Sequence, residues 1–143
     1  MLEENKQLTK QEQLTRELSS FYGTENHYLH ELPFGNSDRS KMYYTDGVKY
    51  FFEKAGCYWF ADIVVTEILP FLNQENNEEW KQFCTIDLEV FPDSTAEIII
   101  GDGNENVKLI KTIQFTDCPE GNWSFWFVPH YVVGGVMYLP TEH

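Results

Sequence analysis

Apolar positions recur at helical spacing along one long stretch, residues 45–72. In its first half the recurring positions are Val48, Phe51, Phe52 and Ala55, and in its second half they are Trp59, Phe60, Ile63, Val64, Ile68 and Phe71. Gly56 separates the two halves. Spacing of three and four residues is typical of an amphipathic helix, and glycine tolerates a break in it. The pattern therefore predicts either two helices broken at Gly56 or one helix kinked there.

Both ends of this segment carry helix-boundary signals. Thr45 or Asp46 is a suitable N-cap, and the acid would lie near the positive end of the helix dipole. Pro70 lacks a backbone N–H, so we expect it to end or bend the helix near Leu69.

After residue 80 the period of the pattern changes from about 3.6 to two. The positions expected on one face of the first strand are Trp80, Gln82, Cys84, Ile86, Leu88 and Val90. Further strands are predicted at 96–100 and 107–115, and one or two more within 123–139, split around Pro129. Helices first and strands afterwards predict an α+β fold, with the N-terminal helices packed on one face of a C-terminal antiparallel β-meander of about four to five strands (80–140).

The N-terminal third divides into two segments. Residues 1–21 lack proline and are rich in helix formers, which predicts a polar N-terminal helix. Residues 22–44 contain turn formers and many aromatic side chains, which predicts an irregular arm that packs against the remainder of the domain. With this arm included, we expect residues 1–143 to form a single domain. The residues expected to contact a partner are Tyr22, His27, Tyr28, His30, Tyr44 and Asp46.

Composition supports a globular, acidic protein. Aromatic residues make up 16% of the chain, so they are expected to supply much of the core volume. The net charge is −13, and residues 57–143 hold fourteen acids against three bases. Because such a surface repels phosphate groups, direct nucleic-acid binding is not expected. A protein partner, or a second copy of the chain, is more compatible with this surface than nucleic acid is.

The cysteines and the hydropathy pattern bear on the compartment. Cys57, Cys84 and Cys118 are widely separated and form no CxxC pair. The N-terminus has no apolar signal-peptide core, and no apolar run is long enough to span a membrane. We therefore expect reduced, mostly buried thiols in a cytoplasmic protein without membrane contact.

The sequence supports no catalytic, cofactor-binding or metal-binding assignment. A nucleophile elbow, a phosphate-cradling glycine loop and a dinucleotide fingerprint are all lacking. The alternative reading is a small hydrolase or metal-dependent enzyme that uses His27, His30 and Cys118, since Cys118 in a predicted turn is the most exposed thiol candidate. We expect no cofactor.

Three motifs together resemble a family of small bacterial proteins of unknown function, often associated with phages or plasmids. They are TDGVKY followed by YWF and an acid, FTDxP, and YLPTE, and the resemblance covers about 22–143. The matching residues are Thr45, Asp46, Gly47, Val48, Tyr58, Trp59, Asp62, Thr116, Asp117, Pro119, Leu139, Pro140 and Glu142. The chain departs from the pattern at its end, where His143 replaces an aromatic residue. The resemblance implies an intracellular bacterial protein and assigns no activity, so our hypothesis is a non-catalytic binding or accessory protein.

Overall fold

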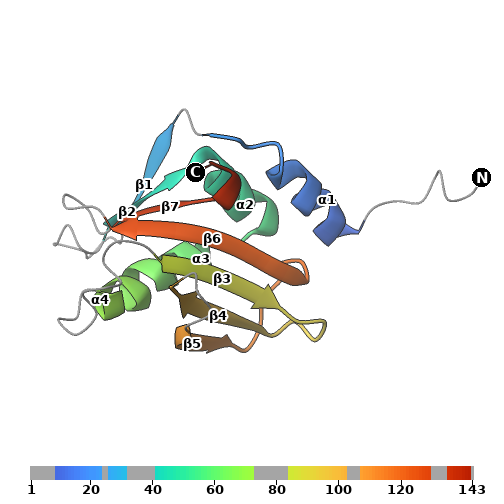
Figure 1. The fold of residues 1–143 in the computed structure, drawn as a ribbon. Coiled ribbons are helices and arrows are strands. Elements are labelled where there is room, and N and C mark those ends of the chain that lie inside the picture. The colour runs from blue at the N-terminus through green and yellow to red at the C-terminus, as the bar shows by residue number, and fades with distance from the viewer. Residues whose placement is uncertain are drawn as a thin grey trace, which may run out of the picture.

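The computed structural model describes residues 9–23, 26–31, 41–72, 84–102, 107–129 and 135–142 (Figure 1). Its helical elements are α1 (Lys10–Leu18), α2 (Asp46–Ala55), α3 (Tyr58–Ile63), the π-helix η3 (Val64–Ile68), α4 (Leu69–Leu72) and the 3₁₀ helix η5 (Pro140–Glu142). Its strands are β1 (His27–Glu31), β2 (Lys41–Thr45), β3 (Cys84–Val90), β4 (Ala96–Gly101), β5 (Val107–Ile113), β6 (Gly121–Pro129) and β7 (Gly135–Tyr138). The fold is α+β, as the sequence predicts.

The strands form one sheet in the order β1-β2-β7-β6-β3-β4-β5. Every pairing is antiparallel except that of β2 with β7. The expected meander holds for β3, β4 and β5 and for the consecutive pair β6 and β7, but it is broken between β5 and β6, because β6 pairs with the other edge of β3. The expected four to five strands are also too few, since the sheet has seven in the described part of the chain.

The two additional strands come from the segment predicted to be an irregular arm. β1 and β2 pair with each other in register over five residues, and β2 then pairs with β7. Strand preference depends mainly on packing against neighbouring strands, and both segments are short and partly polar. β1 and β2 therefore join the sheet because β2 can pair with the edge of β7. The sequence pattern within β1 and β2 does not predict this pairing. Residues 32–40 of this arm lie outside the described residues.

The core is aromatic and lies between the sheet and the helices of residues 46–72, which lie behind the sheet in Figure 1. Phe51 of α2 contacts Phe125 of β6 with ring centroids 5.0 Å apart, and Phe60 of α3 contacts the same ring at 5.5 Å. The strand face predicted to be apolar is buried at Cys84, Ile86, Leu88 and Val90. Trp80, predicted on this face, lies outside the described residues. Aromatic residues thus supply core volume, as their number predicts.

One core contact depends on a glycine in β7. Gly135 is paired with Pro129 of β6, and its backbone faces the Phe127 ring. A Cβ atom built at this position would overlap the Phe127 ring carbons. Glycine therefore allows β7 to approach β6 while Phe127 stays fully buried.

The helical segment 45–72 breaks at Gly56, as predicted. Gly56 ends α2 in the left-handed conformation with φ of 65°, which glycine adopts without a Cβ penalty. Pro70 was expected to end or bend the helix near Leu69; the helix does not end there, because α4 runs from Leu69 to Leu72. The π-helix η3 directly precedes α4, so Pro70 lies within a continuous helical segment and has no N–H to donate to the preceding turn.

The start of α2 is capped by the far end of the chain. Thr45 occupies the N-cap position, but its side chain accepts no hydrogen bond from the helix. Instead, Thr45 Oγ1 donates to Glu142 Oε1 over 2.6 Å, and the Gly47 N–H donates to Glu142 Oε2 over 3.0 Å. The Leu139 N–H also donates to Glu142 Oε1, at 3.0 Å. A buried carboxylate thus satisfies the helix N-terminus that Thr45 or Asp46 was expected to cap.

Gly47 is required for this contact. A Cβ at Gly47 would lie 2.5 Å from Leu139 Cδ1 and 2.7 Å from Glu142 Oε1. The motif at 45–48 and the motif at 139–142 therefore form one packed unit in space, which we call the Glu142 cap.

The N-terminal helix packs on α2. Thr9 and Glu12 form a reciprocal capping box, so α1 begins at Lys10. Leu14 is buried, and the Phe21 ring contacts the Tyr50 ring of α2 at 5.5 Å. Residues 1–8 of the predicted helix lie outside the described residues. In the described part of the chain, no helix is long and apolar enough to cross a membrane.

Candidate functional site

The β1–β2 hairpin lies against the helical segment and brings aromatic and charged side chains together. In the antiparallel register Tyr28 is opposite Tyr44, and His30 is opposite Met42. Residues two apart on a strand point to the same face, so Tyr28, His30 and Tyr44 share one face. Tyr44 on that face contacts Phe52 of α2, with ring centroids 5.2 Å apart. This face of the hairpin therefore packs against the helices.

Asp46 joins the hairpin to the first turn of α2. Tyr28 Oη donates to Asp46 Oδ1 over 2.9 Å, and the Asn26 N–H donates to Oδ2 over 3.3 Å. An acid in the first helical turn is favoured by the helix dipole, which fixes the carboxylate in place. The hydrogen bond to Asp46, followed by partial burial, raises the pKa of Tyr28. Tyr28 thus acts as a neutral donor.

Lys49 and Glu53 extend this group along α2. Lys49 Nζ lies 5.1 Å from the centroid of the Tyr28 ring and 3.2 Å from Glu53 Oε1. A cation over an aromatic face is attracted to the ring electrons, so Lys49 helps to hold the Tyr28 ring. The hydrogen bond to Glu53 raises the pKa of Lys49, which keeps the ammonium charged.

Tyr44 and Tyr58 form the centre of the surface. Tyr44 is 7% exposed, and its ring contacts the rings of Tyr28 at 5.6 Å and His30 at 6.5 Å. Burial, assisted by the neighbouring Tyr58 hydroxyl, raises the pKa of Tyr44 to about 12. Tyr58 at the start of α3 is 39% exposed, and its ring also contacts the Phe52 ring with centroids 5.3 Å apart.

His30 links β1 to α3. Its Nε2 atom lies 2.8 Å from Asp62 Oδ1, across 32 residues of sequence. The histidine side chain is 17% exposed and the aspartate side chain 53%. We call the combined set the hairpin–helix surface, and its members are Tyr28, His30, Tyr44, Asp46, Lys49, Glu53, Tyr58 and Asp62.

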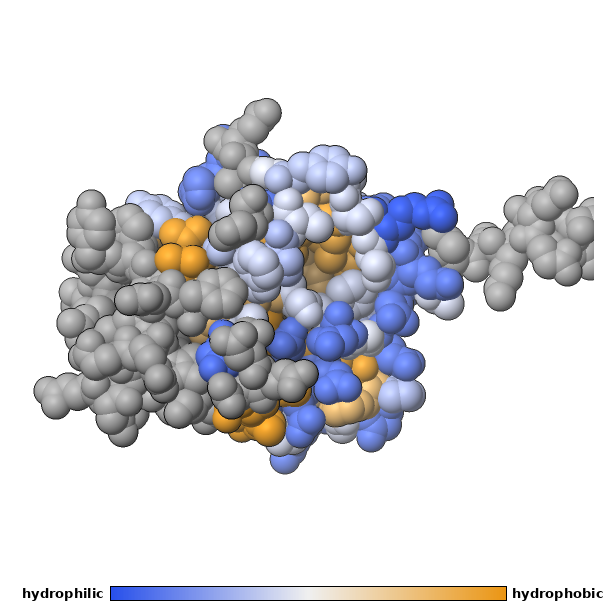
Figure 2. Space-filling view, viewed as in Figure 1, coloured by the Kyte–Doolittle hydropathy of each residue, from blue (hydrophilic) through white to orange (hydrophobic). Residues whose placement is uncertain are grey.

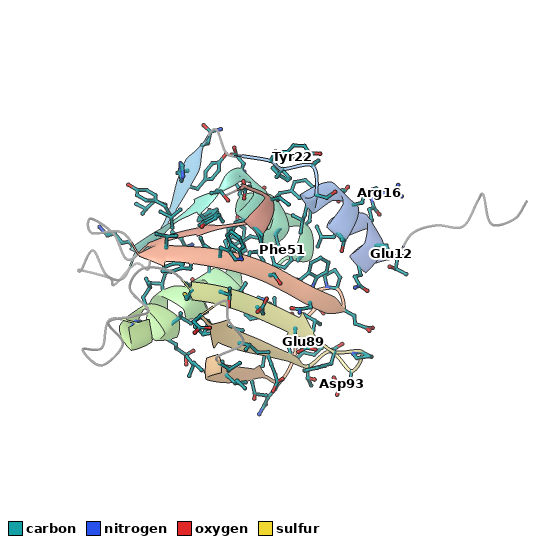
Figure 3. All side chains as sticks on the ribbon, viewed as in Figure 1. Glu12, Arg16, Tyr22, Phe51, Glu89 and Asp93 are labelled. Carbon is teal, nitrogen blue, oxygen red and sulfur yellow. The ribbon has the colours of Figure 1, made fainter. Side chains whose placement is uncertain are left out.

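Two of the six residues expected to contact a partner lie elsewhere. His27 is on the opposite face of β1, where its ring lies 6.4 Å from the Tyr43 ring. Tyr22 is 80% exposed on the connection between α1 and β1 (Figure 3). The structure therefore brings Tyr28, His30, Tyr44 and Asp46 together and leaves Tyr22 and His27 apart.

The residues of the enzyme alternative are not brought together. His27 and His30 point to opposite faces of β1, and within the described ranges no group of three His, Cys, Asp or Glu side chains could hold a metal ion. Cys118, expected to be the most exposed thiol, is buried, because its turn folds inward against Cys57 and its N–H donates to Thr116 Oγ1. The hydrogen bond with Cys118 and burial raise the pKa of Cys57, which disfavours a thiolate there.

Sequence reasoning did not identify the helix-borne half of the surface. Lys49 and Glu53 are on one side of α2 at a spacing of four, and Tyr58 and Asp62 repeat that spacing on α3. Residues four apart lie on one helical face, so this spacing is the sequence signal that could have identified the two pairs. Glu142 was noted only as part of a motif, and its capping role needs a contact across 95 residues.

The described part of the chain is a small α+β fold in which a seven-stranded, mostly antiparallel sheet packs on a broken helical segment. The chain belongs to a family of unknown function, DUF6876, whose family model matches residues 12–143. The resemblance to a family of unknown function is thus confirmed, and the match begins within α1, earlier than residue 22. No curated protein and no solved structure matches the chain.

Proposed function

We propose that this protein is a non-catalytic accessory protein of a bacterium or its mobile elements, which binds a protein partner in the cytoplasm through the hairpin–helix surface. The observation that supports this proposal is the convergence of tyrosine, histidine and carboxylate side chains from β1, β2, α2 and α3 on one surface. Hydrogen bonds across 18 and 32 residues hold it together.

The residue types suit an interface. Tyrosine combines a large apolar ring with a hydrogen-bonding hydroxyl, and it is enriched at the energetic centres of protein interfaces. Tyr28 and His30 are already held by Asp46 and Asp62, so binding would lose little side-chain entropy at these positions. Tyr58 provides the exposed aromatic ring.

The charge of the surface indicates a basic partner. Asp46, Glu53 and Asp62 contribute three carboxylates against the single ammonium of Lys49. The chain as a whole has a net charge of −13, and Figure 2 shows hydrophilic side chains over α1 and over the lower strands. Glu89 and Asp93 in Figure 3 mark the acidic end of β3 and the turn that follows. Opposite charge on a partner would speed association, whereas nucleic-acid phosphates would be repelled.

The test is a comparative affinity capture from the native host, with quantitative mass spectrometry. The chain is immobilised as wild type, as Tyr58→Ala, as Asp62→Asn and as Phe115→Ala. Phe115 is a matched control, because it is an exposed aromatic (69%) at the opposite end of the sheet, after β5. The expected result is a basic protein captured by wild type and Phe115→Ala, and reduced at least tenfold with Tyr58→Ala.

The same capture can contradict the proposal. A partner retained equally by Tyr58→Ala and Asp62→Asn would place the binding surface elsewhere. Recovery of DNA or RNA in the absence of a protein would contradict the protein-binding assignment. Capture should also weaken as salt increases, because screening shortens the reach of the surface charges.

A further inference from the structure

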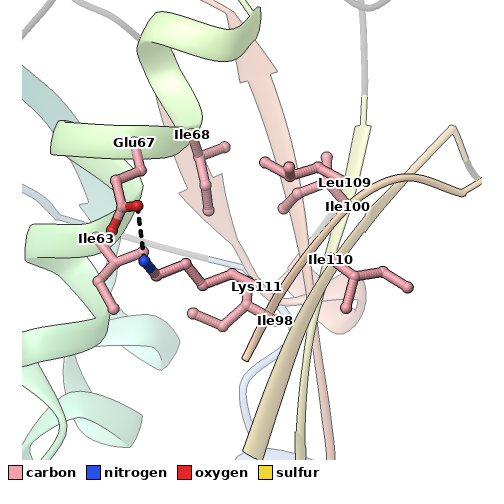
Figure 4. A pocket seen from close by; sticks show the side chains of 8 residues that line it. All are labelled: Ile63, Glu67, Ile68, Ile98, Ile100, Leu109, Ile110 and Lys111. Carbon is pink, nitrogen blue, oxygen red and sulfur yellow. Dashed lines mark hydrogen bonds and ion pairs between the residues drawn. The ribbon is translucent and has the colours of Figure 1, made fainter. Parts of the chain in front are cut away.

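A pocket of about 220 Å³ lies at the other end of the sheet from the hairpin–helix surface. One wall is the α3–η3 segment and the other is the pair of strands β4 and β5 (Figure 4). The lining residues are Ile63, Glu67, Ile68, Ile98, Ile100, Leu109, Ile110 and Lys111. β1 and β5 are the two edges of the sheet, so the pocket lies apart from the β1–β2 hairpin, although Ile63 in its wall directly follows Asp62 of the hairpin–helix surface.

The helical wall contains an unusual turn. Residues 64–68 are π-helical, and the Leu69 N–H bonds to the Val64 carbonyl, five residues back. Single π turns are rare in helices and occur frequently at functional sites. Ile63 lies about one turn before the adjacent residues Glu67 and Ile68, and all three line the pocket. The distorted turn is therefore part of the pocket wall.

The lining chemistry is aliphatic and electrically neutral. Six of the eight lining residues are isoleucine or leucine, although strand alternation places the Ile110 side chain on the opposite face of β5 from Leu109 and Lys111. The remaining two form an ion pair, in which Lys111 Nζ lies 2.8 Å from Glu67 Oε1 and joins the two walls (Figure 4). Both side chains are partly exposed, at 38% and 45%, so the pair lies at the rim. In the described residues no buried side-chain polar atom lacks a partner, so no buried polar side chain in the lining requires a polar group from an occupant.

Size and charge together indicate the occupant. A dry aliphatic cavity of about 150 Å³ is large enough to bind benzene, so this pocket can hold a molecule of at least that size. An anionic ligand would compete with Glu67 for Lys111 and would approach a half of the chain that carries fourteen acids against three bases. We propose that the pocket binds a small uncharged aliphatic molecule, a short alkyl chain with a neutral polar end at the Glu67–Lys111 pair.

The first experiment titrates the full chain with 1-alkanols of increasing length, from butanol to octanol, and follows isoleucine δ1-methyl signals by NMR. Each buried methylene should tighten binding about fourfold until the pocket is full, after which the affinity should level off. The shifted methyls should be those of Ile63, Ile68, Ile98 and Ile100. Ile86 of β3 and Ile113 at the end of β5 do not line the pocket and serve as internal references. Absence of shifts, or shifts spread equally over the references, would overturn the proposal.

The second experiment fills the pocket. Leu109→Trp adds bulk to the pocket side of β5, and Thr112→Trp adds the same bulk to an exposed position on the opposite face of that strand. Alkanol binding should weaken at least tenfold in Leu109→Trp and stay within twofold in Thr112→Trp. Ile63→Phe, from the helical wall, provides a second filling variant if Leu109→Trp fails to fold.

A folded filling variant that binds hexanol as tightly as wild type would overturn the assignment to this pocket. Hexanoate, which has the same chain length with a carboxylate, should bind at least tenfold more weakly than hexanol. Equal affinity for the two would overturn the uncharged character of the occupant.

Discussion

Replacing Glu142 by alanine removes the carboxylate that accepts hydrogen bonds from Thr45 Oγ1, the Gly47 N–H and the Leu139 N–H. Thr45 is 2% exposed and Glu142 is 9% exposed, so water replaces these bonds poorly. A hydrogen bond to a charged group contributes about 1.5–3 kcal/mol, and unpaired buried donors carry an additional desolvation penalty. Because the three bonds share one acceptor group, they do not add fully, and we expect Glu142→Ala to lower the free energy of unfolding by about 3–5 kcal/mol.

Glu142→Gln removes the negative charge of the side chain but keeps part of its capacity to accept hydrogen bonds. The glutamine carbonyl can replace Oε1 and accept from Thr45 and Leu139, but its amide N–H₂ then faces the Gly47 N–H. We therefore expect a smaller loss of about 1.5–3 kcal/mol. Thr141→Ala, at an exposed neighbouring position in η5, is the matched control and should change stability by less than about 0.5 kcal/mol.

The assay is urea unfolding followed by tryptophan fluorescence and circular dichroism. With an m value of about 2 kcal/mol/M, the alanine variant should lower the midpoint by about 2 M. A loss below about 1 kcal/mol for Glu142→Ala, or equal losses for Glu142→Ala and Thr141→Ala, would refute the Glu142 cap as a stabilising contact.

Three further predictions follow from single residues. Gly47→Ala should lower the free energy of unfolding by about 1–3 kcal/mol in the same urea assay, because its Cβ would press on Leu139 and Glu142. Alanine is the better helix former, so without this contact the variant would be stabilised. A stabilised variant would therefore contradict this packing. Gly135→Ala should cost about 1–3 kcal/mol, because its Cβ would overlap Phe127, and an unchanged melting temperature would refute it. The raised pKa of Tyr44, about 12, means that the folded protein keeps a proton that the unfolded chain loses near pH 10. Its contribution to stability is therefore constant below pH 10 and falls by about 2 kcal/mol as the pH rises from 10 to 12, a fall that Tyr44→Phe should abolish in unfolding titrations.

Local sequence patterns were sufficient to predict the structure wherever burial follows sequence periodicity. The break at Gly56 follows from the helical spacing on both sides of a residue that tolerates positive φ. The inward face of β3 follows from strict alternation, which places Ile86 and Leu88 in the core. In both cases the signal lies within one segment, so no distant contact is needed to read it.

The location of the hairpin–helix surface was predicted in part. Tyr28, His30, Tyr44 and Asp46 were selected because an aromatic arm leads into a helix start. Their partners on the helices were not selected as contact residues, since Lys49 has the pattern of an ordinary helix position and Tyr58 and Asp62 stand out only as part of a motif. Whether His27 or His30 faces the helices depends on the register of β1 against β2, because a shift of one residue exchanges the two faces.

The sequence by itself determined an α+β chain with a broken helical segment, an alternating sheet and an acidic surface, because spacing, composition and charge act locally. The tertiary structure alone decided the pairing of β2 with β7, the Glu142 cap at the start of α2 and the pocket beside η3. Each of these joins segments that are distant in sequence, up to 97 residues apart for the cap. These features are stabilised by groups that come into contact only when the chain folds. The sequence pattern within one segment therefore does not predict them.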